Sequence, residues 1–409
     1  MVAFDLRWAT KTAAGMLVLG AAVVCSPALP QTDVEHGALG NLQEEIRAAE
    51  EQAGPNSTEI IAPLTALGLL YQEAGEPRLA AAALNQAVAA VRINYGLYSL
   101  DQAPLIRGLI ANADSIGDIS SAWDLEQVLL KLGARHPDDL ETARIFRETA
   151  DRRMGVLARF DAGEFPREVI IGCYYQGGSA NPDLGLSPRN CTSGSREMAK
   201  RSLAMEARTY YTRAVDIMLR NQSYASEDLP RLLIELAKSS YTYGGQKLGR
   251  TSLTYLLAYQ ASNEAPLVSR AETLVQIADW DLLHAVGLDE ADAALAEYAR
   301  AYDLMTQKGI ADDAVRRIFA PDAPIVLPAF MPSPLEGEGA SSGYVDVAFA
   351  IDKYGHVKHV KLVGSSEGTD REAAKRVEHM VMRSRFRPRL IDSRTADEAR
   401  LVVRYPLTE

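Results

Sequence analysis

A repeated helical hairpin pattern is the feature of this sequence that most restricts its fold. A glycine lies between two Ala/Leu-rich stretches at Gly75, and again 42 residues later at Gly117. A second such pair, Gly244 and Gly287, is 43 residues apart. Apolar residues around these glycines return every three or four positions, which is the period of one helix face. Because one hairpin cannot bury its own apolar face, the pattern predicts hairpins that stack into a short α-solenoid.

The first repeat places small and large residues in a specific order. The stretch "LTALGLLYQEAGEPRLAAAALNQAVAAV" contains Leu64, Leu67, Gly68, Tyr71, Gly75, Ala80, Leu84 and Ala87. This spacing resembles the tetratricopeptide repeat, in which small residues let two helices approach and large residues fill the groove between them. The resemblance implies a concave groove that takes peptides or protein segments. Packed helices without a binding role are the alternative interpretation.

Two later stretches show the same helical period in a looser form. We expect two buried helix faces, one made of Leu229, Leu232, Leu233, Leu236 and Tyr241, the other of Ala291, Ala294, Leu295, Tyr298, Ala301 and Tyr302. The predicted helical repeat regions are therefore 35–160 and 197–319.

The N-terminus has the features of a secretory signal peptide. Arg7 and Lys11 precede an uncharged apolar run at 13–25, which is shorter than the roughly 20 residues of a membrane span. The pattern predicts a signal peptide at 1–28, with cleavage after Ala28. An uncleaved anchor and a lipoprotein with a lipidated Cys25 are the alternatives. We therefore expect a periplasmic protein, or alternatively an inner-membrane protein with a periplasmic body.

The remaining cysteines, Cys173 and Cys191, flank a stretch rich in Gly, Pro, Asn and Ser. This stretch belongs to an insertion, 161–196, between the two repeat regions. In an exported protein such a pair predicts a disulfide, and two unrelated thiols are the alternative. A zinc site would need two further ligands, and no histidine lies near them in the sequence.

A proline-rich linker at 320–342 ends the helical pattern, because prolines at this density cannot continue a helix. After it, apolar residues alternate with a period of two, as in a half-buried strand. A turn at "DKYG", a second strand at 356–363, a helix at 370–384 and a last strand "ARLVVRYPL" follow. The module 343–409 is thus predicted as β-β-α-β. The whole chain is predicted to be mainly α: an α-solenoid followed by a small α+β module, whose three-stranded sheet carries one helix.

The stretches "GYVDVAFAIDKYGHVKHVKLVGSS" and "AAKRVEHMVMRSRFRP", followed by the last apolar strand, occur in this module in that order. The module resembles the C-terminal domain of TonB, a periplasmic energy transducer. The resemblance implies that an extended peptide, for example from an outer-membrane receptor, docks by strand addition along the edge of the last strand. The binding residues carried over from the resemblance are Arg400, Leu401, Val402, Val403, Arg404 and Tyr405.

Two short patterns could suggest metal or hydrolase chemistry. His356 and His359 would face opposite sides of a regular strand, so they cannot bind one metal ion together without a bulge. The G-x-S-x-G pattern at 364–368 lacks the parallel sheet that a nucleophile elbow needs, and a strand-to-helix loop is the simpler interpretation. We predict no catalytic residue, no metal site and no cofactor, and therefore a non-enzymatic protein.

Charge restricts the partners. The net charge of −11 argues against nucleic-acid binding by the whole chain. The terminal module is basic, and its charge could steer an acidic peptide, contact an anionic surface or simply form a solvated face. The residues that contribute most are Lys358, Lys361, Arg383, Arg385, Arg387 and Arg389.

The leading hypothesis is an exported protein-binding protein linked to envelope transport, and the alternative is a membrane-anchored TonB-type transducer for outer-membrane transport. The sequence leaves contact with a membrane open.

Overall fold

The structure is a computed structural model. It describes residues 31–161, 196–221, 228–241, 244–306, 312–321, 323–329, 341–367, 369–391, 394–396 and 398–408. The predicted signal peptide and the candidate disulfide of Cys173 and Cys191 lie outside these residues.

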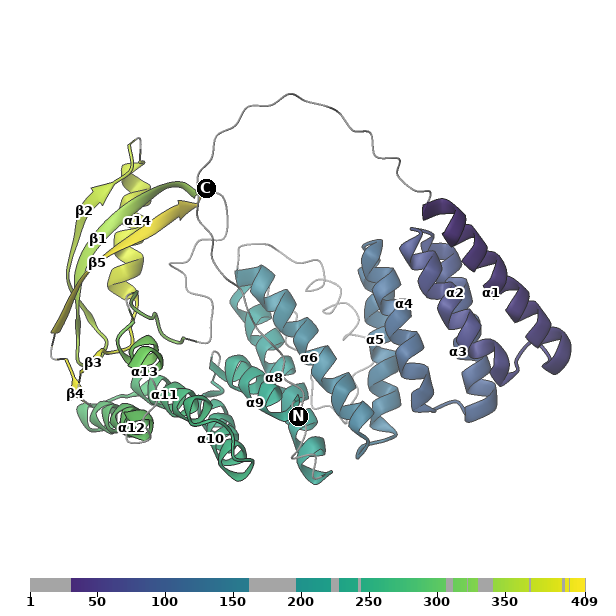
Figure 1. The fold of residues 1–409 in the computed structure, drawn as a ribbon, viewed down its shortest axis with the longest axis horizontal. Helices are drawn as coiled ribbons and strands as arrows, with labels where there is room; N and C mark the ends of the chain where they lie inside the picture. The colour runs from purple at the N-terminus through teal and green to yellow at the C-terminus, as the bar shows by residue number, and fades with distance from the viewer. Residues whose placement is uncertain are drawn as a thin grey trace.

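The first part of the chain is a row of helices that follow one another in space as they do in sequence (Figure 1). They are α1 (Gln31–Ala53), α2 (Ile61–Glu73), α3 (Pro77–Tyr95), α4 (Ala103–Ser115), α5 (Ile119–Ala134), α6 (Leu140–Asp161), α8 (Arg196–Arg220), α9 (Asp228–Tyr241), α10 (Gln246–Ser262), α11 (Leu267–His284), α12 (Leu288–Thr306) and α13 (Asp312–Phe319). Neighbouring helices pack as the pairs α2–α3, α4–α5, α6–α8, α9–α10 and α11–α12. Stacked helical hairpins were predicted, and this prediction is confirmed.

Three of the four predicted hairpin glycines share the same backbone conformation. Gly75, Gly117 and Gly244 have φ values of 72°, 69° and 84°, the left-handed conformation that commonly ends a helix. Gly287 is different, because its φ lies outside that region and its carbonyl accepts from the Ala291 N–H at the start of α12. Gly287 thus lies between α11 and α12, as predicted, but it does not share the left-handed conformation of the other three.

Close helix contact in the first hairpin depends on Gly68. A Cβ atom there would lie 2.7 Å from Cγ of Leu84, which is too short for van der Waals contact. Leu84 also reaches α4, where a Cβ on Gly108 would lie 3.2 Å from its Cδ1. Leu84 thus fills the space between α3 and α2, as the repeat pattern predicted, and it also fills the space toward α4 of the next hairpin. The two helix faces expected around Leu232 and Tyr298 are likewise buried or partly buried.

The terminal module contains β1 (Ser341–Asp352), β2 (Val357–Ser365), α14 (Arg371–Arg383), a small hairpin of β3 (Leu390–Ile391) and β4 (Arg394–Thr395), and β5 (Glu398–Thr408). The main sheet is antiparallel with the order β2-β1-β5. Its apolar core gathers Val345, Val347, Phe349, Ile351, Val377, Val381, Phe386 and Tyr405. Asp370 caps α14 by accepting from the N–H groups of Glu372 and Ala373, at 3.2 Å each. The predicted three-stranded sheet with one helix is confirmed.

The terminal module rests on the last helices of the row (Figure 1). Within the predicted linker, the described residues 323–329 include Leu327, whose N–H donates to the Arg385 carbonyl at 2.8 Å. The Arg387 N–H donates to the Ile325 carbonyl at the same distance. Leu327 and Leu390 belong to the apolar core around α11, α12 and α13. This part of the linker is therefore paired with the module and packed on the helices.

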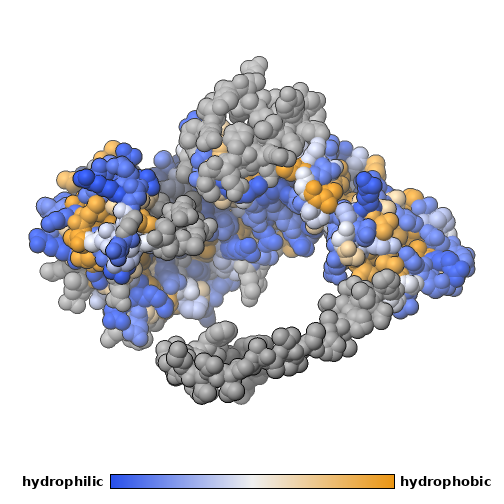
Figure 2. All heavy atoms as spheres, turned by 90° about the horizontal axis from the view of Figure 1, so that it is seen from above, coloured by the Kyte–Doolittle hydropathy of each residue, from blue (hydrophilic) through white to orange (hydrophobic). Residues whose placement is uncertain are grey.

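Within the described residues, no helix combines the length and the apolar content that crossing a membrane requires. Seen from above, the coloured surface is largely hydrophilic, and its apolar residues form separate patches (Figure 2). Recognition on this face would therefore depend on local features.

Candidate peptide-binding edge of the terminal sheet

Strand β5 lies at one edge of the terminal sheet, because the strand order is β2-β1-β5. All six predicted binding residues, Arg400 to Tyr405, lie in β5. Of the strands that the structure describes, only β1 pairs with it. The predicted binding residues are thus together on an edge strand.

Backbone direction in β1 shows which residues of β5 face outward. Tyr344 donates its N–H to Oγ of Ser366 and accepts from the Ser366 N–H, both at 3.0 Å, so its backbone points away from β5. Asp352, eight residues later, donates to the His356 carbonyl in the same direction. Pro406, opposite Tyr344, has no N–H to donate. In an antiparallel pair, residues that exchange hydrogen bonds alternate with residues that do not. The backbone N–H and C=O groups of even-numbered residues in β1 therefore point toward β2, and those of odd-numbered residues point toward β5.

The same alternation divides the predicted edge into two sets. Leu401, Val403 and Tyr405 stand opposite Phe349, Val347 and Val345, so their backbones pair with β1. Their side chains also pack into the module core.

Arg400, Val402 and Arg404 form the other set, which we call the outer-edge residues. Their N–H and C=O groups point away from the sheet, so they are the groups that a further strand would meet.

The opposite edge of the sheet is less suited to strand addition. The pairing of β2 with β1 has two register shifts, and His359, in one of them, has a φ of 56°. Lys358 and Lys361 are exposed beside it. Bulges and lysines are common devices that prevent edge pairing. By contrast, β5 keeps one register with β1 from Glu398 to Leu407.

The side chains of the outer-edge residues lie on the sheet face away from α14. Arg404 donates from Nε and Nη2 to Asp346 at 2.8 and 2.9 Å, and its guanidinium lies 3.7 Å from the centre of the Tyr344 ring. The hydrogen bond from Arg404 lowers the pKa of Asp346. Val402 is 67% exposed, an unusual degree for an aliphatic side chain in a strand. The outer edge therefore presents an apolar side chain beside an arginine held over β1.

Three of the basic residues predicted to form a charged face are used inside the molecule instead. Arg387 is bonded to Asp279 of α11, and Arg389 donates to the carbonyls of Ala320 and Pro321 at 3.2 Å. Arg385 donates to the Tyr354 carbonyl at 3.0 Å, and burial lowers its pKa. The prediction of a solvated or partner-facing charge is wrong for these three arginines. The sequence could not predict these contacts, because a backbone carbonyl can belong to any residue and Asp279 is distant in the chain.

The two histidines lie close to a bulge that sequence alternation did not reveal. His359 occupies the irregular position in β2, and His356 lies 3.5 Å from Asp352. Both histidines are exposed. Among the described residues, no three His, Cys, Asp or Glu side chains are grouped so that they could hold a metal ion.

Ser366, the central residue of the G-x-S-x-G pattern, is part of the turn between β2 and α14. Its Oγ accepts from the Tyr344 N–H and shares a 2.8 Å hydrogen bond with Oγ1 of Thr369. These contacts fix the turn and connect it to β1. The predicted strand-to-helix loop is therefore present at this position.

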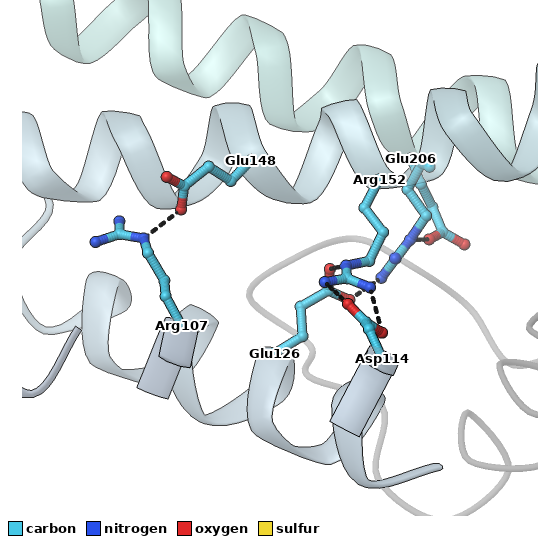
Figure 3. Close-up of polar contacts among 7 residues, drawn as sticks. Arg107, Asp114, Glu126, Glu148, Arg152 and Glu206 are labelled. Carbon is cyan, nitrogen blue, oxygen red and sulfur yellow. Dashed lines mark hydrogen bonds and ion pairs between the residues drawn. The ribbon is translucent and has the colours of Figure 1, made fainter. Parts of the chain in front are cut away.

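The helical body has a cleft lined by α4, α5 and α6. Arg107 of α4 contacts Glu141 and Glu148 of α6, each at 2.5 Å. Arg152 of α6 reaches Asp114 at 3.0 Å (Figure 3). Each of these arginines pairs with a carboxylate of another helix, so the positive and negative charges neutralise each other. The ion pairs also connect successive hairpins.

Beneath this cleft, Arg153 of α6 is buried, with 2% of its side chain exposed. It donates to Glu126 at 2.6 Å and to Glu206 at 2.9 Å, and it stacks over the Trp123 ring at 4.2 Å. Burial opposes its charge, but the two glutamates outweigh burial and raise the pKa of Arg153. The sequence analysis missed this ion-pair cluster. The only local signal is an arginine on the apolar face of α6, between Thr149 and Val156.

Comparison with known proteins gives matches in structure only. No family model matches the chain, and no curated protein matches it. BtubC (BKLC) from P. vanneervenii is similar over 68% of this chain and 92% of its own, with 14% identity and a TM-score of 0.37. A putative kinesin light chain from Podosopora anserina with nearly identical TPR-like repeats is similar over 63% and 94%, with 15% identity and a TM-score of 0.35.

Likenesses this distant carry no argument about function. The description of the body as tetratricopeptide-like rests on its own hairpins, on Gly68 and Leu84, and on the turn glycines. Scaffolds of stacked helical hairpins generally present surfaces that bind proteins. The chain is a tetratricopeptide-like helical repeat scaffold that ends in a three-stranded sheet.

Proposed function

We propose that this chain is an exported, non-enzymatic protein-binding scaffold that docks an extended peptide of its partner on the outer edge of β5. The observation that carries this proposal is the direction of the backbone at Arg400, Val402 and Arg404, on a regular edge strand. The resemblance of the module to the TonB C-terminal domain supports the same edge. A link to envelope transport follows from that resemblance and belongs to the proposal.

Strand addition suits this edge for a physical reason. An added strand satisfies the outward N–H and C=O groups of β5, and each such hydrogen bond contributes about 1 kcal/mol net. Val402 offers apolar contact on the open face, where a peptide side chain would lie about 5 Å from it. Main-chain bonds would supply affinity, and the contacts at Val402 and the two arginines would supply selectivity.

The docking of the module on the helices would let one partner contact both β5 and the helical row. Because Arg387 joins the module to α11, a peptide on β5 is held in a defined position relative to the helical row. A partner that also contacts the helices would then gain affinity from both sites, since the second contact forms at high effective concentration.

The proposal is tested by crosslinking in living cells. We would place a photo-crosslinking amino acid at Arg400, whose side chain is 84% exposed. We expect a discrete adduct that maps to one extended segment of an envelope protein. A second substitution, Val402→Pro, removes an outward N–H without removing a bond to β1, and we expect it to lower the adduct yield at least tenfold.

The control places the crosslinker at Val286, which is 94% exposed on the helical body. An adduct at Arg400 that is insensitive to Val402→Pro would contradict strand addition. Adducts only from Val286 would place the function in the helices instead.

The alternative, a TonB-type transducer anchored in the inner membrane, differs in its N-terminus. N-terminal sequencing of the exported protein separates the two. A mature chain that starts near Leu29 rules out the anchor, and a retained apolar run would overturn the cleaved form.

A further inference from the structure

The end of α3 and its connection to α4 expose large apolar side chains at an unusual density. Ile93 and Leu97 are 62% and 61% exposed, and Tyr95 and Tyr98 are about half exposed. No other six-residue stretch of the described chain exposes as many large apolar side chains. Single exposed apolar residues are normal on a protein surface, whereas a group of this density is typical of a contact site. We call these four residues the apolar loop tip.

A buried glutamine holds the loop in one conformation. Gln102 is 1% exposed, and its Nε2 donates to the carbonyls of Leu97 at 2.9 Å and Ser99 at 3.1 Å. Its Oε1 accepts from Nε of Arg92 at 2.7 Å. Gly96 ends α3 with a φ of 102°, and its carbonyl accepts from the Ser99 N–H at 3.1 Å. The apolar side chains therefore cannot turn inward without breaking these hydrogen bonds.

The connections on either side also hold the loop. Asn94 donates from Nδ2 to the carbonyl of Asn56, between α1 and α2, at 2.6 Å. His136, between α5 and α6, donates from Nε2 to the Tyr98 carbonyl at 2.7 Å. The Arg135 guanidinium lies 4.7 Å from the centre of the Tyr98 ring. The apolar loop tip is thus tied to both neighbouring connections of the helical row.

The loop backbone is suited to a medium without water. All four carbonyls from Gly96 to Ser99 accept a hydrogen bond from within the chain. An exposed loop commonly leaves such groups to water, and removing water from an unpaired carbonyl costs free energy. Here water can leave without opening the hydrogen bonds of these carbonyls. This arrangement favours contact with lipid, which offers no replacement for lost hydrogen bonds to water.

Charge and residue type indicate the kind of surface that fits. Residues 92–101 and 135–139 contain two arginines and three aspartates, so they carry no excess positive charge to attract anionic lipids. Tyrosine is enriched where a bilayer meets water, because its ring is apolar and its hydroxyl is polar. Isoleucine and leucine supply the apolar area that enters the acyl boundary.

We propose that the apolar loop tip inserts into the surface of a lipid bilayer, and that apolar contact drives the insertion. The site lies on the helical body and is independent of the β5 edge, so failure of either proposal leaves the other standing.

A photoreactive lipid tests the insertion. The full chain is mixed with phosphatidylcholine vesicles that contain a trace of phosphatidylcholine with a diazirine in its acyl chain. Trypsin cuts after Arg92 and Arg107, so the peptide 93–107 contains the whole tip. We expect this peptide to carry the highest adduct yield within residues 31–409. Mapping by peptide separates the tip from the apolar run at 13–25. Added phosphatidylglycerol or high salt should leave the yield unchanged, because salt screens charge and not apolar contact.

Ile93→Ser together with Leu97→Ser should lower the adduct yield on 93–107 roughly tenfold or more, because it removes apolar area that enters the bilayer. Both side chains are mostly exposed, so the melting temperature should stay unchanged. The matched control is Val286→Ser together with Leu288→Ser, which removes two other exposed aliphatic side chains of the helical body. The control should leave the yield on 93–107 unchanged.

The proposal is overturned if the peptide 93–107 carries no more adduct than the peptide that contains Val286. It is also overturned if the control pair lowers the yield on 93–107 as much as the tip pair does, or if high salt abolishes the adduct. A photo-crosslinking amino acid at Leu97 that yields a discrete protein adduct in living cells, without lipid adducts on vesicles, would assign the tip to a protein partner instead.

Discussion

Arg387 of the terminal module donates to both carboxylate oxygens of Asp279 in α11, from Nε at 2.9 Å and from Nη2 at 2.5 Å. Tyr298 of α12 donates its hydroxyl to the same carboxylate at 2.5 Å. Asp279 is 0% exposed. Burial opposes the charge of Arg387, but Asp279 outweighs it and raises the pKa of Arg387. These contacts join the module to the last hairpin, so the module covers the end of the helical row as a cap does in repeat proteins.

Asp279→Asn should destabilise the protein strongly, because it leaves the Arg387 guanidinium buried without a counter-charge. We expect a loss of about 3–5 kcal/mol in the free energy of unfolding, measured by urea denaturation. The matched control is Asp346→Asn, which breaks the exposed pair with Arg404 and should cost far less stability, because solvent screens this pair. Equal effects of the two substitutions would show that the contact of Arg387 with Asp279 does not hold the module.

Gly68→Ala should destabilise the first hairpin, since the added methyl group overlaps Leu84. We expect a cost of about 1–3 kcal/mol, measured by thermal or urea unfolding. Gly155→Ala in α6 is the control, because nothing lies within 4 Å of its added Cβ. That substitution should stabilise by up to about 1 kcal/mol, through the helix preference of alanine. A neutral Gly68→Ala would mean that Leu84 moves aside freely.

Arg153→Met should be costly, because it leaves Glu126 and Glu206 buried without a cation. We expect a loss of about 3–5 kcal/mol in urea unfolding. Adding Glu126→Leu and Glu206→Leu to the same protein should recover most of that loss, since an apolar cluster needs no counter-charge. If the triple variant is no more stable than Arg153→Met, the cost lies in packing around Trp123 and not in charge.

The carboxyl group of Asp346 should titrate below its ordinary pKa of 3.8, because Arg404 holds it in the charged form. A pKa that is lower in the folded than in the unfolded protein contributes stability above the unfolded pKa, and this contribution is lost as the pH falls through the folded pKa. NMR titration of the Asp346 carboxyl carbon measures the midpoint. In Arg404→Gln the midpoint should rise toward 3.8, and a midpoint that does not move would exclude Arg404 as the cause.

Periodicity by itself determined most of the secondary structure. The helix face with Leu229, Leu232 and Leu236, and the alternating strand with Val345 and Val347, are buried as the apolar spacing predicted. The turn at Gly75 and the cap of α14 at Asp370 also follow from local residues. These features are readable because each depends on the conformation of a few consecutive residues.

Only the tertiary structure decided which distant groups meet. Arg387 and Asp279 are 108 residues apart, and Arg153 and Glu206 are 53 residues apart. The outward direction of Val402 follows from the pairing of β5 with β1, and the bulge at His359 arises in the pairing of β2. Such contacts depend on how whole elements pack, and packing leaves no period in the sequence. The sequence therefore determined the hairpins and the terminal sheet, whereas packing decided the cap, the outer edge and the buried ion pairs of Arg153.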